Sequence, residues 1–342
     1  MEMFLNILFF LLGLVLLIKG ADFFVIGASA IAKKLKVSNL IIGLTVVAIG
    51  TSLPELAISI NCAIKGNVGI SIGNIVGSNM ANMFLIVGVI ACISNIKVKK
   101  STKNIEFPLL LIATSLLLLF ASDSIINGGE INVISRTESI IFLALFIFYI
   151  FENVYFARLE RKNFSYNIEN EKYTVQQDTK INEKDIWEKK LKVWQMIIYL
   201  IVGIGAVIFG GECIARTSKF LALKAGMSEN LVGLTIVAIG TSLPELATSI
   251  VAARKGKTDL AIGNIIGSNI LNIVLVLAMT GVISQIAVSM DIIIDLCILL
   301  VSTIIFMILA IRKMELGRVE GIIFSSIYLL YIVFEIVKNY CF

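Results

Sequence analysis

Long apolar stretches alternate with short polar segments along almost the whole chain. A helix of about 20 apolar residues crosses the ~30 Å hydrocarbon core of a bilayer. A hydrophilic segment, 157–192, separates a first half, 1–156, from a second half, 193–342. We therefore predict an all-α membrane protein with a central linker and ten transmembrane helices, five in each half. They are expected at residues 3–31, 40–64, 69–93, 107–121, 138–156, 193–215, 230–253, 260–285, 291–311 and 321–337.

The same pattern of polar residues occurs twice, at a constant offset of 190 positions. GLTVVAIGTSLPEL begins at Gly43 and GLTIVAIGTSLPEL begins at Gly233, and the two copies continue into GNIVGSN and GNIIGSN. The repeats cover residues 40–88 and 230–278. Because five spans per half is an odd number, the second half enters the membrane in the opposite orientation. We therefore expect two inverted five-helix repeats, an architecture of secondary transporters.

Composition and charge agree with a membrane location. Hydrophobic residues make up 58% of the chain and charged residues 15%, with a mean hydropathy of +0.95, so the chain cannot cover a water-facing surface. Most of the 29 lysines and arginines fall in loops that would share one side, with the largest group in 157–192. Such loops stay in the cytoplasm. We expect a monomer in the lipid bilayer of the plasma membrane, with both termini outside, segment 157–192 inside and no nucleic-acid partner.

The residue types exclude several kinds of chemistry. The chain has no histidine, and its five cysteines are scattered without metal-ligand spacing, which removes His-based catalysis and the H-E-x-x-H class of metalloprotease. An intramembrane hydrolase would have little chemistry left. A cation channel would use a symmetric oligomer, and an inverted repeat inside one chain argues against it. We expect a transporter rather than an enzyme, and no cofactor.

Each repeat places one glutamate in an otherwise apolar span. Thr51 and Ser52 precede Glu55 by four and three residues, so all three lie on one face of a helix. A glutamate inside a membrane costs several kcal/mol unless it is paired, and no lysine or arginine lies near it in the span. The glutamates are therefore candidate cation ligands. The second copy holds the same residues as Thr241, Ser242 and Glu245.

A proline follows each threonine–serine pair. Pro54 has no N–H, so the carbonyl of Gly50 loses its helical partner and the Gly50–Thr51 pair is expected to unwind locally. Pro244 acts in the same way on Gly240. A freed carbonyl in hydrocarbon is tolerated only where protein, water or an ion satisfies it. A cation is the natural candidate.

The next span of each repeat adds polar residues at steps of four. Together with the glutamates they supply hard oxygen ligands, which suit Ca²⁺ in a flexible cage of six to eight oxygens better than they suit Mg²⁺. Soft metals are disfavoured because no Cys or His is placed to bind them. Alternatively, these residues form a polar packing face between helices. They are Asn74, Ser78 and Asn82 in the first copy and Asn264, Ser268 and Asn272 in the second.

GTSLPEL followed by GNIVGSNMAN, and GTSLPEL followed by GNIIGSNILN, resemble the paired alpha repeats of the cation/calcium exchanger superfamily. The ten-helix plan is similar to that of its prokaryotic sodium/calcium exchangers. The resemblance implies that helices two, three, seven and eight form a central cluster that binds Ca²⁺ or several Na⁺ in alternation, while helices one and six slide across it. It implies that Ca²⁺ is bound by Glu55 and Glu245 with the main-chain oxygens of Thr51 and Thr241. For Na⁺ it implies the two glutamates together with Ser52, Ser78, Asn82, Ser242, Ser268, Asn272 and the carbonyls of Ala48 and Ala238.

The fixed charge of the site suggests a mechanism of exchange. Two buried carboxylates without counter-ions are too costly to seal off from water, so the empty carrier stays open on one side, and one Ca²⁺ or two or more Na⁺ allow it to close. Some relatives carry an aspartate at one position of the pair formed here by Asn82 and Asn272, which leaves ratios of two and three Na⁺ per Ca²⁺ open. The alternative function is exchange of Ca²⁺ or another divalent cation for H⁺, with the glutamate pair as proton acceptor.

Overall fold

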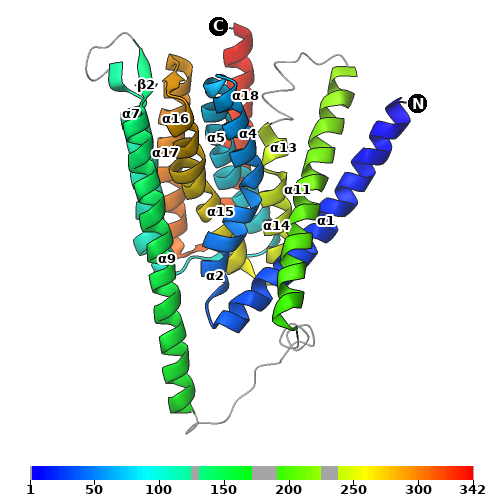
Figure 1. The fold of residues 1–342 in the computed structure, drawn as a ribbon, viewed down its shortest axis with the longest axis vertical. Coiled ribbons are helices and arrows are strands. Elements are labelled where there is room, and N and C mark those ends of the chain that lie inside the picture. The colour runs from blue at the N-terminus through cyan, green and yellow to red at the C-terminus, as the bar shows by residue number, and fades with distance from the viewer. Residues whose placement is uncertain (1, 125–130, 172–190, 225–237, 342) are drawn as a thin grey trace.

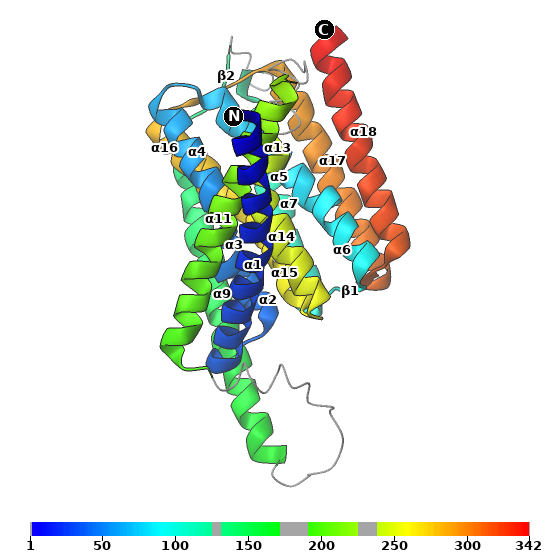
Figure 2. The ribbon, with the colours of Figure 1, turned by 90° about the vertical axis from the view of Figure 1, so that its right-hand side faces the viewer.

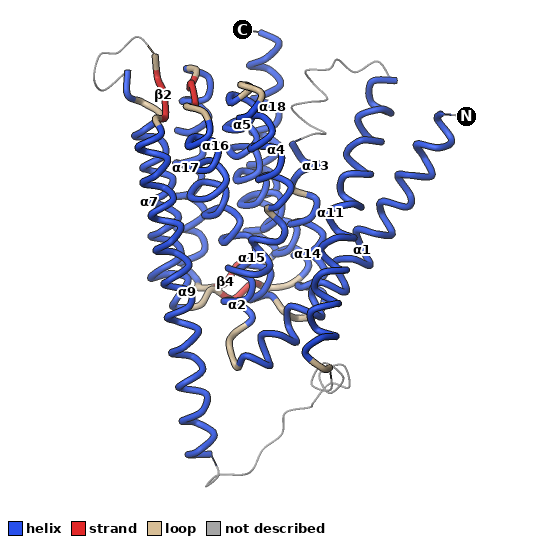
Figure 3. Tube along the Cα trace, viewed as in Figure 1, coloured by secondary structure: helices blue, strands red, loops and turns tan. Residues whose placement is uncertain are grey.

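The computed structural model describes residues 2–124, 131–171, 191–224 and 238–341, and helices dominate it (Figure 3). The elements of the first half are α1 (Glu2–Leu35), α2 (Asn39–Ile42), η1 (Gly43–Val47), α3 (Ala48–Thr51), α4 (Leu53–Ile64), α5 (Val68–Met80), η2 (Ala81–Ile86), α6 (Val87–Ile93), β1 (Ile96–Lys97), η3 (Thr102–Glu106), α7 (Phe107–Phe120), β2 (Asn132–Ile134) and α9 (Arg136–Glu171). Those of the second half are α11 (Val193–Lys224), α13 (Ala238–Thr241), α14 (Leu243–Arg254), α15 (Thr258–Leu271), η5 (Asn272–Leu277), α16 (Ala278–Ile283), β3 (Ile286–Val288), α17 (Met290–Lys313), β4 (Glu315–Leu316) and α18 (Arg318–Cys341). The elements marked η are π-helical turns.

The helices have the length and surface of membrane spans. Eight described helices or helix runs are long and apolar enough to cross a bilayer, and a ninth candidate is the pair Asn39–Thr51 and Leu53–Ile64, which bends by 44°. Large apolar side chains point outward, with Phe151 70% and Leu330 69% exposed, a surface that suits lipid rather than water. The chain is a multi-pass membrane protein. The expected span at 230–253 begins outside the described residues.

The helices form a bundle with two distinct ends (Figures 1 and 2). Helices α1 and α11 lie side by side on one flank, and the long helix α9 lies on the other. Between these flanks lie α4, α5, α14 and α15. Helix α1 begins and α18 ends at the same end of the bundle, which we call the termini end. Helix α9 ends and α11 begins at the opposite end, which we call the linker end.

Two short antiparallel sheets lie at opposite ends of the bundle. Strand β1 pairs with β4, with Ile96 opposite Leu316, at the linker end. Strand β2 pairs with β3, with Ile134 opposite Ile286, at the termini end. Ile96 and Ile286 are equivalent positions of the two halves, separated by the same offset of 190 residues. Equivalent elements therefore lie at opposite ends of the molecule.

The turns between the two helices of each repeat also match. Gly66, after α4, has φ = 77°, and Gly256, after α14, has φ = 71°. This left-handed conformation is readily adopted only by glycine, which is why it commonly ends a helix. A glycine thus allows the chain to turn back at the equivalent point of each repeat.

Glycines bring α1 and α11 into backbone contact. Gly13 and Gly20 are seven residues apart on α1, and Gly203 and Gly210 are seven apart on α11. A Cβ added at Gly13 would lie 2.9 Å from the carbonyl oxygen of Gly210, and one added at Gly20 would lie 2.9 Å from that of Gly203. The two helices therefore pack antiparallel, and so closely that a side chain at either glycine would collide with the other helix.

Helix α9 is longer than the sequence pattern predicted. We expected a span at 138–156 and a linker from residue 157, but α9 continues to Glu171. Residues 157–162 are Ala, Arg, Leu, Glu, Arg and Lys, all of which have high helix propensity. A polar sequence ends the membrane span without ending the helix. The rest of the expected linker lies mostly outside the described residues.

Candidate functional site

The first helix of each repeat is broken beside its glutamate. Ser52 (φ −84°, ψ 5°) separates α3 from α4, and Ser242 (φ −89°, ψ 4°) separates α13 from α14. The Ser52 N–H still donates to the carbonyl of Ala48 at 3.0 Å, so the break occurs one residue later than the Gly50–Thr51 step where we expected it. Pro54 fits the first turn of the new helix, where no intrahelical N–H donor is needed.

The two glutamates lie together in the centre of the bundle. Glu55 and Glu245 are each 1% exposed and close enough to interact electrostatically. Both oxygens of Glu55 and Oε2 of Glu245 have no hydrogen-bond partner, and Oε1 of Glu245 accepts one long bond of 3.4 Å from Ser52. Each glutamate sits in the first turn of its helix, where the helix dipole favours negative charge. Helix dipoles offset only part of the cost of two buried charges.

Contacts between the repeats are reciprocal. The Thr51 hydroxyl lies 3.0 Å from Oδ1 of Asn264 and 3.4 Å from the hydroxyl of Ser268. In the same way, the Thr241 hydroxyl lies 3.2 Å from Oδ1 of Asn74 and 3.4 Å from the hydroxyl of Ser78. Asn74, Ser78 and Asn82 form one line of polar residues, and Asn264, Ser268 and Asn272 form the other; we call these lines the polar stripes. Each threonine thus contacts the polar stripe of the other repeat. This reciprocity is what a two-fold relation between the repeats requires.

Asparagines connect the repeats in the middle of the site. Asn79 donates to the carbonyl of Asn269 at 3.2 Å, and Asn272 donates to Oδ1 of Asn79 at 3.0 Å. The Oδ1 atoms of Asn82 and Asn272 have no hydrogen-bond partner although both residues are 1% exposed. Amide oxygens are therefore available beside the carboxylates.

The structure brings the predicted site residues together. The predicted residues of the two broken helices and the two polar stripes are each at most 8% exposed. These residues are Thr51, Ser52, Glu55, Ser78, Asn82, Thr241, Ser242, Glu245, Ser268 and Asn272. Ala48 is buried, and its carbonyl accepts from the Ser52 N–H and, at 3.4 Å, from the Thr51 hydroxyl. Ala238 begins α13, and its side chain lies outside the described set.

The sequence pattern did not predict several residues that lie at or beside the site. Asn79 and Asn269 are the final residues of the two GSN segments, and their occurrence in both copies is the signal that would have identified them. Tyr149, on α9, donates its hydroxyl to the carbonyl of Leu44 in η1 at 2.6 Å. A π-helical turn leaves carbonyls without their α-helical partners, and such turns often lie at functional sites. No local sequence signal links Tyr149 to that turn.

Equivalent positions of α5 and α15 differ in exposure within the described part of the chain. Asn74 is half-buried and Gly73 beside it is exposed, whereas their equivalents Asn264 and Gly263 are fully buried. Helix α5 begins at the termini end and α15 begins at the linker end (Figure 1). Gly263 packs against Leu40 and Gly43 of the first repeat, and the equivalent positions 230 and 233 lie outside the described residues.

Comparison with known proteins places the chain in a family. The sodium/calcium exchanger protein family matches residues 5–154 and 195–337. The sodium/calcium exchanger MaX1 of Methanosarcina acetivorans is 35% identical over 96% of this chain and 97% of its own length. The inner membrane protein YrbG of Escherichia coli is 32% identical over 92% of each chain.

Solved structures give the same result. The sodium-calcium exchanger NCX_Mj, determined after soaking in Na⁺ without Ca²⁺, superposes with a TM-score of 0.76 and 32% identity, covering 97% of this chain and 99% of that one. The matched residues include both repeats and the helices around them. On the family match, the full-length relatives and the common fold, this chain belongs to the sodium/calcium exchanger family and is a membrane transporter of cations rather than an enzyme.

Proposed function

We propose that the protein is a secondary active antiporter that exchanges Ca²⁺ for Na⁺ by alternating access. The observation that carries this proposal is the buried pair Glu55 and Glu245, in which three of four carboxylate oxygens have no hydrogen-bond partner. Two such charges need a cation or protons, because an uncompensated buried charge costs several kcal/mol. The name of the Methanosarcina relative, a sodium/calcium exchanger, supports Na⁺ and Ca²⁺ as the ions.

In this proposal Ca²⁺ binds between the two carboxylates and the main-chain oxygens of Thr51 and Thr241. A flexible set of six to eight oxygens suits Ca²⁺, and the breaks at Ser52 and Ser242 support main-chain participation. Na⁺ binds in flanking positions that share Glu55 and Glu245 with neutral oxygens from both repeats. These come from Ser52, Ser78, Asn82, Ser242, Ser268, Asn272 and the carbonyls of Ala48 and Ala238.

The charge of the pair couples the two fluxes. Without cations, the carboxylates oppose closure of the site away from water, so the empty carrier does not return. One Ca²⁺, or at least two Na⁺, removes this barrier. Each net elementary charge moved is worth about 2.3 kcal/mol per 100 mV, so three Na⁺ per Ca²⁺ would respond to membrane potential and two would not.

We propose that the chain folds as ten helices in two inverted halves, 1–156 and 193–342, joined by a cytoplasmic linker. The reciprocal threonine contacts, and the equivalent sheets at opposite ends of the bundle, support the inversion. We further propose that the protein works as a monomer in the plasma membrane with both termini outside. The lysines and arginines near the linker end support this orientation, and α1 begins on the side where α18 ends, as this topology requires (Figure 1).

The test is Ca²⁺ uptake into proteoliposomes driven by a Na⁺ gradient at fixed pH. We expect Glu55→Gln and Glu245→Gln each to abolish uptake. The matched control Asp291→Asn, which removes an exposed carboxylate in the first turn of α17, should transport normally. Near-normal uptake by either glutamine variant would contradict the site.

The same vesicles test the alternative function. The unpartnered carboxylates could equally accept protons, which is the observation that favours Ca²⁺/H⁺ exchange. Uptake that follows a pH gradient and ignores a Na⁺ gradient would establish that function instead. Measuring uptake at several clamped membrane potentials then gives the ratio of Na⁺ to Ca²⁺, because the flux responds to voltage only if each cycle moves net charge.

A further inference from the structure

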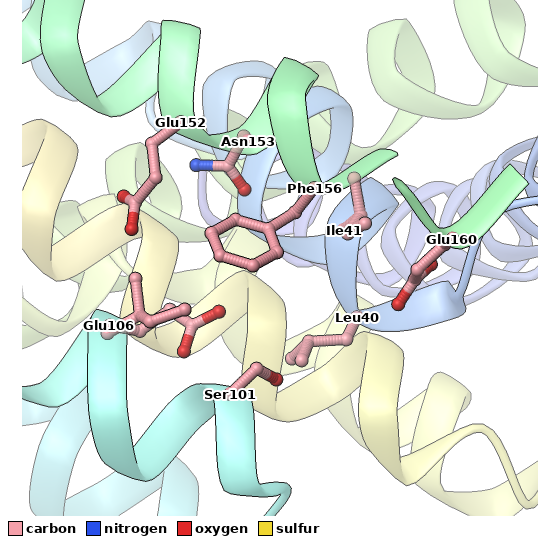
Figure 4. A pocket seen from close by; sticks show the side chains of 9 residues that line it. Leu40, Ile41, Ser101, Glu106, Glu152, Asn153, Phe156 and Glu160 are labelled. Carbon is pink, nitrogen blue, oxygen red and sulfur yellow. The ribbon is translucent and has the colours of Figure 1, made fainter. Parts of the chain in front are cut away.

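Another buried carboxylate lies at the linker end, away from the central cluster. Glu106, the last residue of η3, is 8% exposed, and its Oε2 has no hydrogen-bond partner. It faces a cavity of ≈ 30 Å³ whose polar lining is completed by Ser101, Glu152, Asn153 and Glu160 (Figure 4). The last three residues lie on α9, so the cavity is enclosed between α9, η3 and the start of α2.

The charges around Glu106 leave it in need of a positive partner. Glu152 and Glu160 are both close enough to repel it electrostatically, and Lys99 is close enough to attract it. Lys99 already forms an ion pair with Asp259 at 2.8 Å. A buried carboxylate that faces two others is costly. A cation bound in the cavity, or a proton on Glu106, would remove this cost.

The geometry of the lining favours a small monovalent cation. The three carboxylates line the cavity, but no three acidic side chains of the described chain converge on one point, which argues against a divalent ion held by several carboxylates. One carboxylate with neutral oxygens suits an alkali cation. Asn153 donates its Nδ2 to the carbonyl of Tyr149 at 2.9 Å, so its Oδ1 remains an acceptor. A water needs about 10–15 Å³ of such space, so the cavity has room for an ion the size of Na⁺ and one water.

We propose that this cavity is a second cation site, separate from Glu55 and Glu245, and that it binds Na⁺. The bound ion would secure the start of the first repeat, because Glu160 accepts a hydrogen bond of 2.7 Å from the Ser38 N–H and Leu40 also lines the cavity. Ser38 caps α2, which leads through η1 to the broken helix. The inference does not depend on which ions the central cluster carries.

The test is thermal unfolding of the detergent-purified Glu55→Gln/Glu245→Gln protein, in which the central carboxylates are absent. Choline chloride is replaced by NaCl or KCl at constant pH and ionic strength. A ligand that binds only the folded state raises Tm with its concentration. We expect NaCl to raise Tm more than KCl, and the added substitution Glu106→Gln to abolish the rise. Asp291→Asn, added as the matched control, should leave the rise unchanged.

Two outcomes would overturn the proposal. One is a Tm that is the same in NaCl and choline chloride, which would leave a proton as the occupant. The other is a Na⁺-dependent rise that survives Glu106→Gln. If that variant does not fold, Glu152→Gln decides, because it removes a half-buried carboxylate of the same cavity. We expect it to increase the NaCl concentration needed for half of the rise, and an unchanged concentration would refute the site.

Discussion

The substitution Asp22→Asn tests how the linker side of the transporter is held closed. Lys255, in the turn after α14, pairs with Oδ1 of Asp22 at 3.0 Å and donates to the Asp22 carbonyl at 3.1 Å. The side chains are 24% and 34% exposed, so solvent screens the pair only in part. This contact fastens the middle of α1 to the second repeat.

The equivalent contact in the other half is not formed. Glu212 and Lys65 occupy the positions that correspond to Asp22 and Lys255, 190 residues away in each case. Glu212 pairs instead with Arg216 on its own helix, and Lys65 is exposed. If the halves are inverted, Asp22 and Lys255 hold the linker side closed in this state. The Glu212–Lys65 contact would then form in the opposite state.

The size of the effect follows from the exposure of the pair. A partly exposed ion pair contributes about 0.5–1 kcal/mol, and Asp22→Asn leaves the bond from Lys255 to the main chain intact. The equilibrium should therefore shift about two- to fivefold toward the state that is open at the linker end. Glu212→Gln should not shift the equilibrium in this direction, because the contact between Glu212 and Lys65 belongs to the opposite state.

Hydrogen–deuterium exchange in saturating NaCl without Ca²⁺, where the Na⁺-loaded carrier can move between its two states, measures this shift. Asp22→Asn is expected to speed exchange of the amides of α2 and η1, at the linker side of the site, by about two- to fivefold. Glu212→Gln is the matched control. Equal exchange in Asp22→Asn and the unmodified protein, or equal acceleration by both substitutions, would refute the reasoning.

Four further substitutions test the helix packing and a turn of the first repeat. Gly20→Val should abolish Na⁺-driven Ca²⁺ uptake, because its Cβ would lie 2.8 Å from a backbone nitrogen of α11; normal uptake would mean that the two helices can separate at this point. Tyr149→Phe leaves the carbonyl of Leu44 unpaired and should lower the free energy of unfolding by about 1–3 kcal/mol, measured by thermal unfolding, and an unchanged Tm would argue against this role. Gly66→Ala should cost about 1–2 kcal/mol because φ is 77°, whereas Gly69→Ala, whose Cβ would meet no atom within 4 Å, should cost nothing measurable in the same assay.

The sequence predicted the membrane class and the family, and both are confirmed. Hydropathy sufficed for the class because a span must bury about 20 apolar residues whatever its neighbours are. The end of α9 was placed too early, since polarity marks where the bilayer ends and helix propensity marks where the helix ends. The ion-binding roles of Glu55 and Glu245 stay predictions.

The sequence by itself determined which residues of the two repeats are equivalent, and that each repeat would place one glutamate next to a helix break. The position of a proline, which has no N–H, and of a charged residue in an apolar span can be identified from the neighbouring residues in the sequence. Only the tertiary structure decided that Thr51 meets Asn264 rather than the stripe of its own repeat, and that Glu106 faces two other glutamates across a cavity. These contacts join residues far apart in the chain, so they depend on how whole helices pack, and no local pattern of residues encodes that packing.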